Sequence, residues 1–189
     1  MVTLTGPRQS GKTTLSKALF PKKPYVSLED PENRNQASQD PRGFLSRYPD
    51  GAIIDEIQRV PDLFSYIQTI VDEKDIEGLF ILTGSQQFEM IESLTQSLAG
   101  RTALIKLLPF SYDEIYINSP PVDLFSLLYT GFYPRIFDKK LNSTEAMSFY
   151  ISTYLERDVR KIINIRDLSI FENFLKLLAG LSGQILNMN

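Results

Sequence analysis

A glycine-rich stretch near the amino terminus carries the residue types that bind phosphate groups. Residues 6–13 match the phosphate-loop pattern G-x-x-x-x-G-K-[ST] at every fixed position. Glycines let the backbone turn its N–H groups toward a triphosphate, while the Lys12 ammonium can lie between the terminal phosphates and the Thr13 hydroxyl can coordinate Mg²⁺. A helix that begins here would direct the positive end of its dipole at the anion. The sequence therefore predicts a nucleotide-binding site at Gly6, Pro7, Arg8, Gln9, Ser10, Gly11, Lys12, Thr13 and Thr14.

A pair of acidic residues follows an apolar run at residues 51–54. If this run is a strand beside the one that precedes the glycine-rich stretch, Asp55 comes next to the Thr13 hydroxyl and can hold Mg²⁺ through water. Glu56 would then face the γ-phosphate and could polarise an attacking water molecule, which favours hydrolysis over transfer to another acceptor. The alternative is that both acids are solvated at a strand end.

Two further polar positions could complete such a site. Ser85 follows another apolar run and could hydrogen-bond the γ-phosphate, with Thr83 and Gln86 as less favoured choices. Arg101 follows an expected helix end and could reach the γ-phosphate of a neighbouring subunit as an arginine finger in a homo-oligomer. The alternatives are an ordinary turn at Ser85 and a favourable charge at a helix carboxyl end for Arg101.

The apolar pattern predicts the elements that position these residues. Strands alternate with helices, which is typical of a parallel sheet covered on both faces, an α/β fold. Helices are expected after the glycine-rich stretch, after Asp30-Pro31 and Asp40-Pro41, from Pro61, and over residues 88–99. β-Branched residues before the glycine-rich stretch and apolar residues at helical spacing after it favour the phosphate site over a plain strand-to-helix turn. The expected strands are residues 1–5, 25–28, 51–56, 78–83 and 102–108.

The pattern changes after Pro109. Ser111 and Glu114 have the spacing of a capping box, and Ser119-Pro120-Pro121 is typical of a linker. The organisation that we expect is an α/β core over residues 1–118 and a helical region over residues 119–189. Helices in that region are expected at residues 124–130, 144–163 and 169–179.

Composition excludes several kinds of chemistry. The 189 residues contain no cysteine and no histidine, which excludes disulfides, thiolate metal sites and Ser-His-Asp triads. The net charge is −3 and no basic run is longer than a pair, which argues against a broad nucleic-acid-binding face. No apolar stretch reaches the roughly 18 residues that span a membrane, and the amino terminus lacks a signal-peptide pattern. We therefore expect a cytoplasmic protein without a membrane partner.

Residues 4–14, 54–61 and 81–85 together resemble the AAA-plus ATPases, and more closely a prokaryotic group of predicted AAA-plus superfamily ATPases. Residues 97–101 and 154–159 are similar to that group too. The resemblance implies a P-loop NTPase fold, a three-layer α/β/α core with a five-stranded parallel sheet of order 5-1-4-3-2. It also implies Mg-ATP as the ligand, with Gly6–Thr14 as Walker A, Asp55-Glu56 as Walker B, Ser85 as the sensor residue and Arg101 as a candidate finger.

Members of that group usually continue into a further C-terminal domain with a winged-helix-like part. On this resemblance we expect the chain to be the core of a longer protein, truncated at both ends, which binds nucleic acid only through a C-terminal domain outside this sequence. The expected function is Mg-dependent ATP binding and hydrolysis, with an unknown protein partner. A nucleotide-dependent switch without turnover and a P-loop phosphotransferase, which would need an acceptor pocket and a lid of arginines, are the alternatives.

Overall fold

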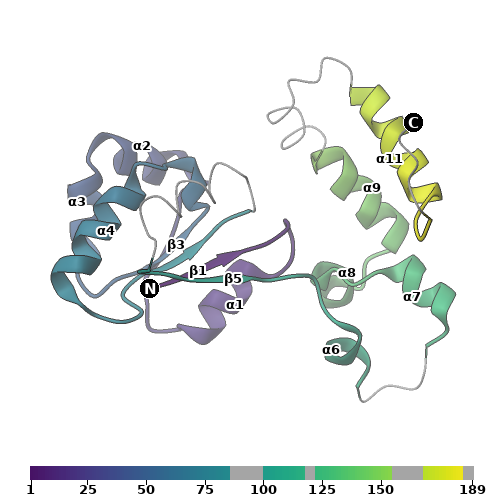
Figure 1. Ribbon diagram of the computed structural model, residues 1–189, viewed down its shortest axis with the longest axis horizontal. Helices are drawn as coiled ribbons and strands as arrows, with labels where there is room; N and C mark the ends of the chain where they lie inside the picture. The colour runs from purple at the N-terminus through teal and green to yellow at the C-terminus, as the bar shows by residue number, and fades with distance from the viewer. Residues whose placement is uncertain (86–99, 118–121, 155–167, 185–189) are drawn as a thin grey trace. The chain divides into compact units, whose positions relative to one another are not determined.

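The computed structural model of the chain describes residues 1–85, 100–117, 122–154 and 168–184. Its centre is a five-stranded sheet in the order β2-β3-β4-β1-β5, in which every adjacent pair of strands is parallel (Figure 1). This is the predicted order 5-1-4-3-2 read from the other edge, so the predicted topology is confirmed. The strands are β1 Val2–Thr5, β2 Tyr25–Ser27, β3 Ile53–Asp55, β4 Ile81–Thr83 and β5 Ala103–Lys106.

The chain divides into two compact units. Residues 1–121 and 132–138 form the first unit, and residues 122–131 and 139–189 form the second. The predicted boundary after residue 118 stays a prediction. Helices of the first unit are α1 Lys12–Leu19, α2 Pro31–Gln39, α3 Pro41–Ser46, α4 Leu63–Lys74, α6 Tyr112–Tyr116 and α8 Pro134–Lys139, with a 3₁₀ turn η1 Ile57–Arg59. Those of the second unit are α7 Leu124–Thr130, α9 Ser143–Tyr154 and α11 Leu168–Gly180.

Two aspartates start consecutive helices where the sequence predicts it. The Asp30 carboxylate accepts a hydrogen bond of 2.8 Å from the backbone N–H of Glu32, and Asp40 accepts one of 2.9 Å from Gly43. Each aspartate is followed by a proline, which has no N–H to lose in the first helical turn. These caps determine where α2 and α3 begin.

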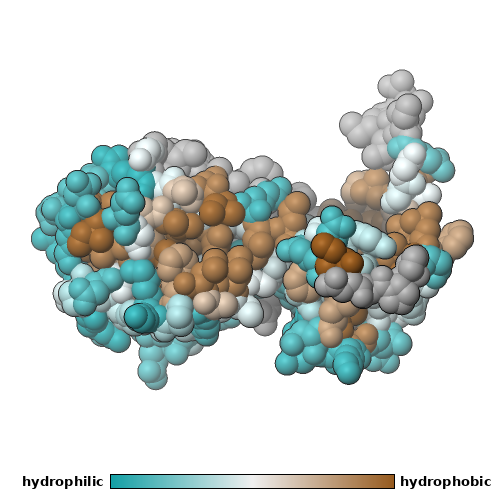
Figure 2. Space-filling model, turned by 90° about the horizontal axis from the view of Figure 1, so that it is seen from below, coloured by the Kyte–Doolittle hydropathy of each residue, from teal (hydrophilic) through white to brown (hydrophobic). Residues whose placement is uncertain are grey.

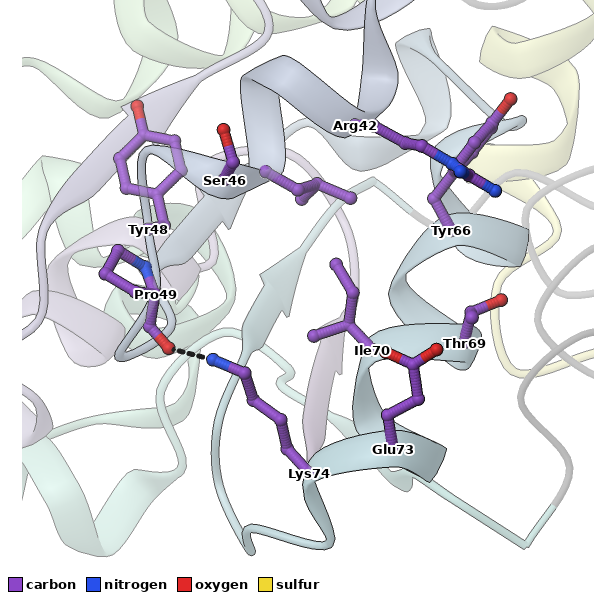
Figure 3. A pocket seen from close by; sticks show the side chains of 10 residues that line it. Arg42, Ser46, Tyr48, Pro49, Tyr66, Thr69, Ile70, Glu73 and Lys74 are labelled. Atoms are coloured by element: carbon purple, nitrogen blue, oxygen red, sulfur yellow. Dashed lines mark hydrogen bonds between the residues drawn. The ribbon is translucent and has the colours of Figure 1, made fainter.

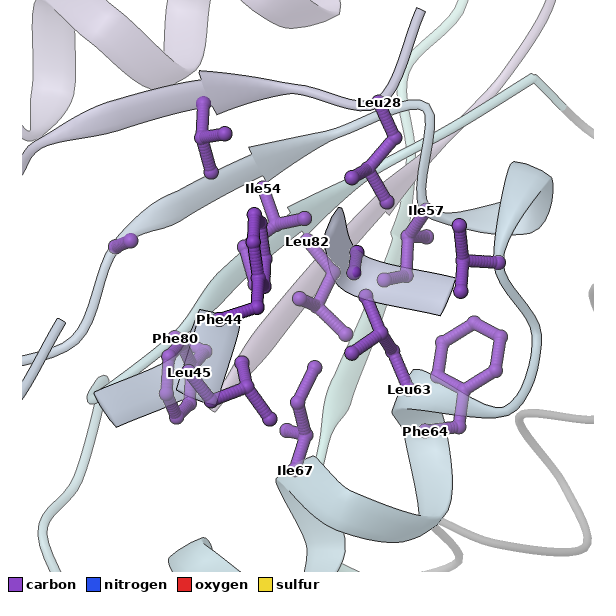
Figure 4. Packing of buried hydrophobic residues seen from close by; sticks show 14 of the residues in the cluster. Leu28, Phe44, Leu45, Ile54, Ile57, Leu63, Phe64, Ile67, Phe80 and Leu82 are labelled. Atoms are coloured by element: carbon purple, nitrogen blue, oxygen red, sulfur yellow. The ribbon is translucent and has the colours of Figure 1, made fainter. Parts of the chain in front are cut away.

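The core lies between the sheet and the helices α2, α3 and α4 (Figure 4). Because side chains alternate along a strand, Ile54 and Leu82 face this core, whereas Asp55 and Thr83 lie on the opposite face of the sheet. Thr13 of α1 hydrogen-bonds Asp55, so α1 covers that second face and the unit has three layers. The buried cluster is Val26, Leu28, Ala37, Phe44, Leu45, Ala52, Ile54, Ile57, Val60, Leu63, Phe64, Ile67, Leu79, Phe80 and Leu82.

Some boundaries differ from those expected. The strand predicted through Glu56 ends at Asp55, because Glu56 takes a left-handed conformation with φ 58° and starts the turn η1. The short helix α8 is not predicted from the sequence, where Pro134 is taken only as part of a helix break. Instead Pro134 opens a helix, a position at which its missing N–H is harmless. The predicted helix at 88–99, the linker at 119–121 and the last part of the predicted 144–163 helix lie outside the described residues.

The helices of the second unit carry many exposed apolar side chains. Figure 2 shows patches of hydrophobic surface on the face that it draws. Within the described residues, no helix combines the length and the apolar character that crossing a membrane requires. The most exposed apolar side chains of these helices include Leu124, Phe125, Leu128, Phe149, Ile170 and Leu177.

Candidate functional site

The glycine-rich loop runs from Gly6 to Gly11 between the end of β1 and the start of α1. Gly6 has φ 140° and Gly11 has φ 92°, values that side-chain-bearing residues rarely adopt. A Cβ atom at Gly6 would lie 2.0 Å from the backbone oxygen of Leu107, so the loop passes directly against the segment after β5. Only glycine fits there, which explains why the first glycine of the pattern is needed in this chain.

Lys12 bends back over its own loop. Its Nζ donates to the carbonyl oxygens of Gly6 at 3.0 Å and Pro7 at 2.7 Å. Burial lowers the pKa of Lys12, and the nearby negative charges of Glu56 and Asp55 oppose that effect. The ammonium is thus held at the loop, and the negative charges of Glu56 and Asp55 partly offset the cost of burying it.

Asp55 is the centre of a hydrogen-bond cluster at the carboxyl edge of the sheet. One carboxylate oxygen, Oδ2, accepts from the hydroxyls of Thr13 at 2.9 Å and Tyr25 at 2.8 Å. The other oxygen, Oδ1, accepts from the hydroxyl of Thr83 and from the backbone N–H of Glu56. The structure therefore brings Thr13 and Asp55 into direct contact, as expected. The premise of that expectation, that the Asp55 strand lies beside β1, is wrong, because β4 lies between β1 and β3. The contact forms nevertheless, because the carboxyl ends of parallel strands meet at one edge of the sheet.

Tyr25 is a member of this cluster that the sequence analysis misses. Burial, followed by the hydrogen bond to Asp55, raises the pKa of Tyr25 to about 12, and the Lys17 ammonium lies 3.4 Å from the centre of its ring. Tyr25 could have been found from the register in which β2 pairs with β3. β2 pairs with β3 so that Tyr25 lies opposite Ile53, two residues before Asp55, and a tyrosine side chain is long enough to span that distance.

Glu56 lies beside the cluster and is joined to Ser85 by a residue that the sequence analysis also misses. The Nε2 atom of Gln58 donates to Glu56 Oε2 and, at 3.0 Å, to the hydroxyl of Ser85. Burial and the Asp55 charge raise the pKa of Glu56, while the hydrogen bond from Gln58 and the charge of Arg8 work in the opposite direction. Ser85 is buried at 6% exposure. Glu56 and Ser85 therefore belong to the same site.

Arg101 does not join this group within the chain. It precedes β5 and so lies at the amino edge of the sheet, whereas the glycine-rich loop and Asp55 follow the carboxyl ends of β1 and β3. Its Nε donates to Asp72 of α4 at 2.5 Å, and its backbone oxygen accepts from the amino terminus at 3.0 Å. A role for Arg101 in its own site is excluded by this position, and its expected role in a neighbouring subunit stays a prediction.

The residues present suit a magnesium ion with a phosphorylated ligand. Mg²⁺ is usually bound through one or two carboxylates, water and substrate phosphates, not by a cage of side chains. Thr13 and Asp55 offer a hydroxyl and a carboxylate that would suit such an ion. The hydroxyl of Ser10, inside the loop, is buried without a hydrogen-bond partner among the described residues, which suits a phosphate oxygen as its partner.

A hollow of about 480 Å³ lies elsewhere, between α3 and α4 (Figure 3). Its lining includes Arg42, Tyr48, Tyr66 and Lys74, and the Lys74 ammonium donates to the backbone oxygen of Pro49 at 2.6 Å. None of the candidate site residues lines it. The hollow is thus separate from the candidate site at the loop and the adjoining strand ends.

Comparison with known proteins agrees with this geometry. A family model described as an AAA domain matches residues 1–116, and a second model, described as a domain of unknown function, matches residues 122–189. The uncharacterized proteins Rv2008c of Mycobacterium tuberculosis and Mb2031c of Mycobacterium bovis are each 35% identical to this chain over 166 residues. That match covers 86% of this chain but 36% of each relative, so the chain spans about a third of their length. The expected resemblance is confirmed: the chain belongs to the AAA domain family and is a nucleotide-binding module of the AAA type.

Proposed function

We propose that this module binds Mg-ATP at the glycine-rich loop and hydrolyses it. The observation that carries the proposal is the 2.9 Å hydrogen bond between the Thr13 hydroxyl and the Asp55 carboxylate, whose charge also acts on the Lys12 ammonium. A hydroxyl and a carboxylate held together next to a lysine form the arrangement that a magnesium–triphosphate complex requires. The charge of Lys12 and the backbone N–H groups of the loop supply the remaining contacts to phosphate.

In the proposed mechanism the loop binds the β- and γ-phosphates and Lys12 neutralises part of their charge. Thr13 and Asp55 would hold Mg²⁺, which supplies further positive charge against the phosphate oxygens when bound. Glu56 accepts the proton of a water molecule while the water oxygen bonds to the γ-phosphorus and the bond to the bridging oxygen breaks, giving ADP and phosphate. A raised pKa makes the Glu56 carboxylate a stronger base than an ordinary glutamate.

A nucleotide-dependent switch with little turnover is the second candidate. The observation that favours it is the hydrogen bond between Gln58 and Glu56, which occupies one oxygen of the proposed base. In a switch, binding of the γ-phosphate would change the conformation of the site, and slow hydrolysis would set the lifetime of that state.

The role proposed for Arg101 requires a neighbouring subunit. Arg101 would act on a neighbouring subunit only after leaving Asp72, with which it forms an ion pair on the surface. Exposed ion pairs of this kind contribute little to stability, so contact with a triphosphate could displace it. The identity of a protein partner, and nucleic-acid binding by a further domain, belong to the whole protein and are proposals of the same kind.

The test is steady-state phosphate release and nucleotide titration on four variants. We expect Lys12→Ala to abolish ATP binding, and Glu56→Gln to keep binding but lower kcat by about 10²–10⁴-fold. The matched controls are Lys22→Ala and Glu77→Gln, because both residues are exposed and neither contacts the site. If Glu56→Gln hydrolysed ATP at the normal rate, Glu56 would not be the base. If the wild type and the control variants bound ATP but released no phosphate above the Lys12→Ala background, the site would act as a switch and not as an ATPase.

A further inference from the structure

Gln58 lies where the proposed base and the proposed sensor meet. Its side-chain amide nitrogen donates to Glu56 Oε2 and to Ser85 Oγ at the same time. A primary amide nitrogen carries two hydrogens in one plane, so it can serve both acceptors with separate N–H groups. The two acceptors come from different strands, because Glu56 follows β3 and Ser85 follows β4. The planar side-chain amide of Gln58 thus links the end of β3 to the end of β4.

The turn η1 holds Gln58 in this position. Ile57 before it is fully buried in the core, and Val60 after it donates its N–H to the Ile57 oxygen at 3.0 Å. Arg59 donates its backbone N–H to the Glu56 oxygen at 3.0 Å, which closes the turn around Gln58. The left-handed conformation of Glu56 makes this reversal possible directly after β3. The anchoring is therefore independent of the two hydrogen bonds that the Gln58 side chain makes.

The direction of the hydrogen bonds decides what Ser85 can do. Because the Ser85 oxygen accepts from Gln58, its own hydroxyl hydrogen remains available for donation. An oxygen of the γ-phosphate is the acceptor that the proposed function would bring there. In addition, the Gln58 Oε1 atom is buried and has no hydrogen-bond partner among the described residues. Such an unpaired acceptor suits a group that gains a donor, such as water, when the site fills.

We propose that Gln58 is a positioning residue that couples Ser85 to Glu56, so that γ-phosphate bound at Ser85 orients the Glu56 carboxylate toward the attacking water. This inference rests on the proposed function of the site. Hydrogen bonds in a chain polarise one another, so a donor bond from Ser85 to phosphate would strengthen the bond that Gln58 makes to Ser85. Gln58 itself touches neither phosphate nor the reacting atoms.

The kinetic test is a double-mutant cycle with Gln58→Met, which keeps the length of the side chain and removes both donors, and Ser85→Ala. We expect each single variant to lower kcat by about 10–100-fold, with KM within about threefold of the wild type. The double variant should be no slower than the slower single variant, because both remove the same coupling. Gln39→Met, at an exposed helix end, is the matched control and should leave kcat unchanged. Multiplying effects in the double variant would overturn the proposal.

A second measurement separates this proposal from the proposed function. In nucleotide-free protein labelled with ¹⁵N-glutamine, the side-chain amide signal of Gln58 is identified by its loss in Gln58→Met. We expect Ser85→Ala to shift that signal and to leave the signal of Gln39 in place; an unmoved Gln58 signal would overturn the proposal whether or not ATP is hydrolysed. If the signal moves but the wild type releases no phosphate above the Lys12→Ala background, hydrolysis is what fails. The preference for ATP over ADP, measured as the ratio of the two affinities, then tests the coupling. If both single variants reduce this preference by the same factor and the double variant reduces it no further, the proposal is supported. Unequal reductions in the single variants, or additive reductions in the double variant, would overturn it.

Discussion

Glu56→Gln should make the folded protein more stable while it stops turnover. In the wild type, burial and the adjacent Asp55 charge make the ionised carboxylate unfavourable, and the Gln58 hydrogen bond and Arg8 offset only part of this. Glutamine has the same shape, carries no charge and can still accept a hydrogen bond from Gln58. We therefore expect the free energy of unfolding to rise by about 1 kcal/mol at neutral pH, the size typical of relieving a partly compensated buried charge.

The pH dependence of that gain follows from the direction of the pKa change. A carboxyl group whose pKa is higher in the folded state binds protons more tightly there, so the wild type loses stability as pH rises above the ordinary glutamate value of 4.5. Below that value the group is protonated in both states and the penalty disappears. The advantage of Glu56→Gln should thus be absent at pH values below 4.5 and should grow as the pH rises through the pKa of Glu56 in the folded state.

The assay is thermal unfolding of wild type, Glu56→Gln and the exposed control Glu77→Gln between about pH 4 and pH 8. For a chain of this length, 1 kcal/mol corresponds to a rise in Tm of about 2–4 °C. The control should show no rise. A Glu56→Gln variant that is less stable than the wild type at pH 7, or equally stabilised at pH 4, would refute the assignment of Glu56 as a buried, disfavoured anion.

Three further substitutions test the parts that hold the site. Gly6→Ala should abolish ATP binding in calorimetry, because its Cβ would lie 2.0 Å from the Leu107 oxygen; normal affinity would contradict the loop geometry. Tyr25→Phe removes a donor to Asp55 and should lower the free energy of unfolding in urea by about 1 kcal/mol, and no loss would mean that the hydroxyl is hydrated instead. Ile67→Ala removes most of a fully buried side chain from the core and should lower the free energy of unfolding by about 2–5 kcal/mol. A smaller loss would show that the core can collapse around the gap.

The sequence predicts the parts of the site that depend on the order of residues along the chain. The glycine-rich loop, the helix after it and the acids at the end of β3 all follow from local patterns, and parallel strands bring their carboxyl ends to one edge. The strand order came from the family resemblance, since apolar runs alone do not say which strands are neighbours. The contact between Thr13 and Asp55 could therefore be expected before the structure.

Residues that act across strands are harder to predict. Tyr25 reaches Asp55 because β2 pairs with β3 in one register, and a shift by one residue would turn its side chain to the other face. Gln58 bonds Ser85 because Glu56 leaves the strand in a left-handed turn, which no residue type at that position demands. The pairing of Arg101 with Asp72 depends on how α4 ends relative to the sheet. In each case long-range packing decides the contact.

The central claim is that the loop and Asp55 together bind a magnesium–triphosphate complex. The most direct measurement is titration of a fluorescent ATP analogue into wild type, Lys12→Ala and Asp55→Ala, with Mg²⁺ and with a chelator. We expect Mg²⁺ to tighten binding to the wild type by about tenfold or more, Asp55→Ala to lose that gain, and Lys12→Ala to show no binding. Equal affinity with and without Mg²⁺ in the wild type, or unchanged binding by Lys12→Ala, would contradict the account.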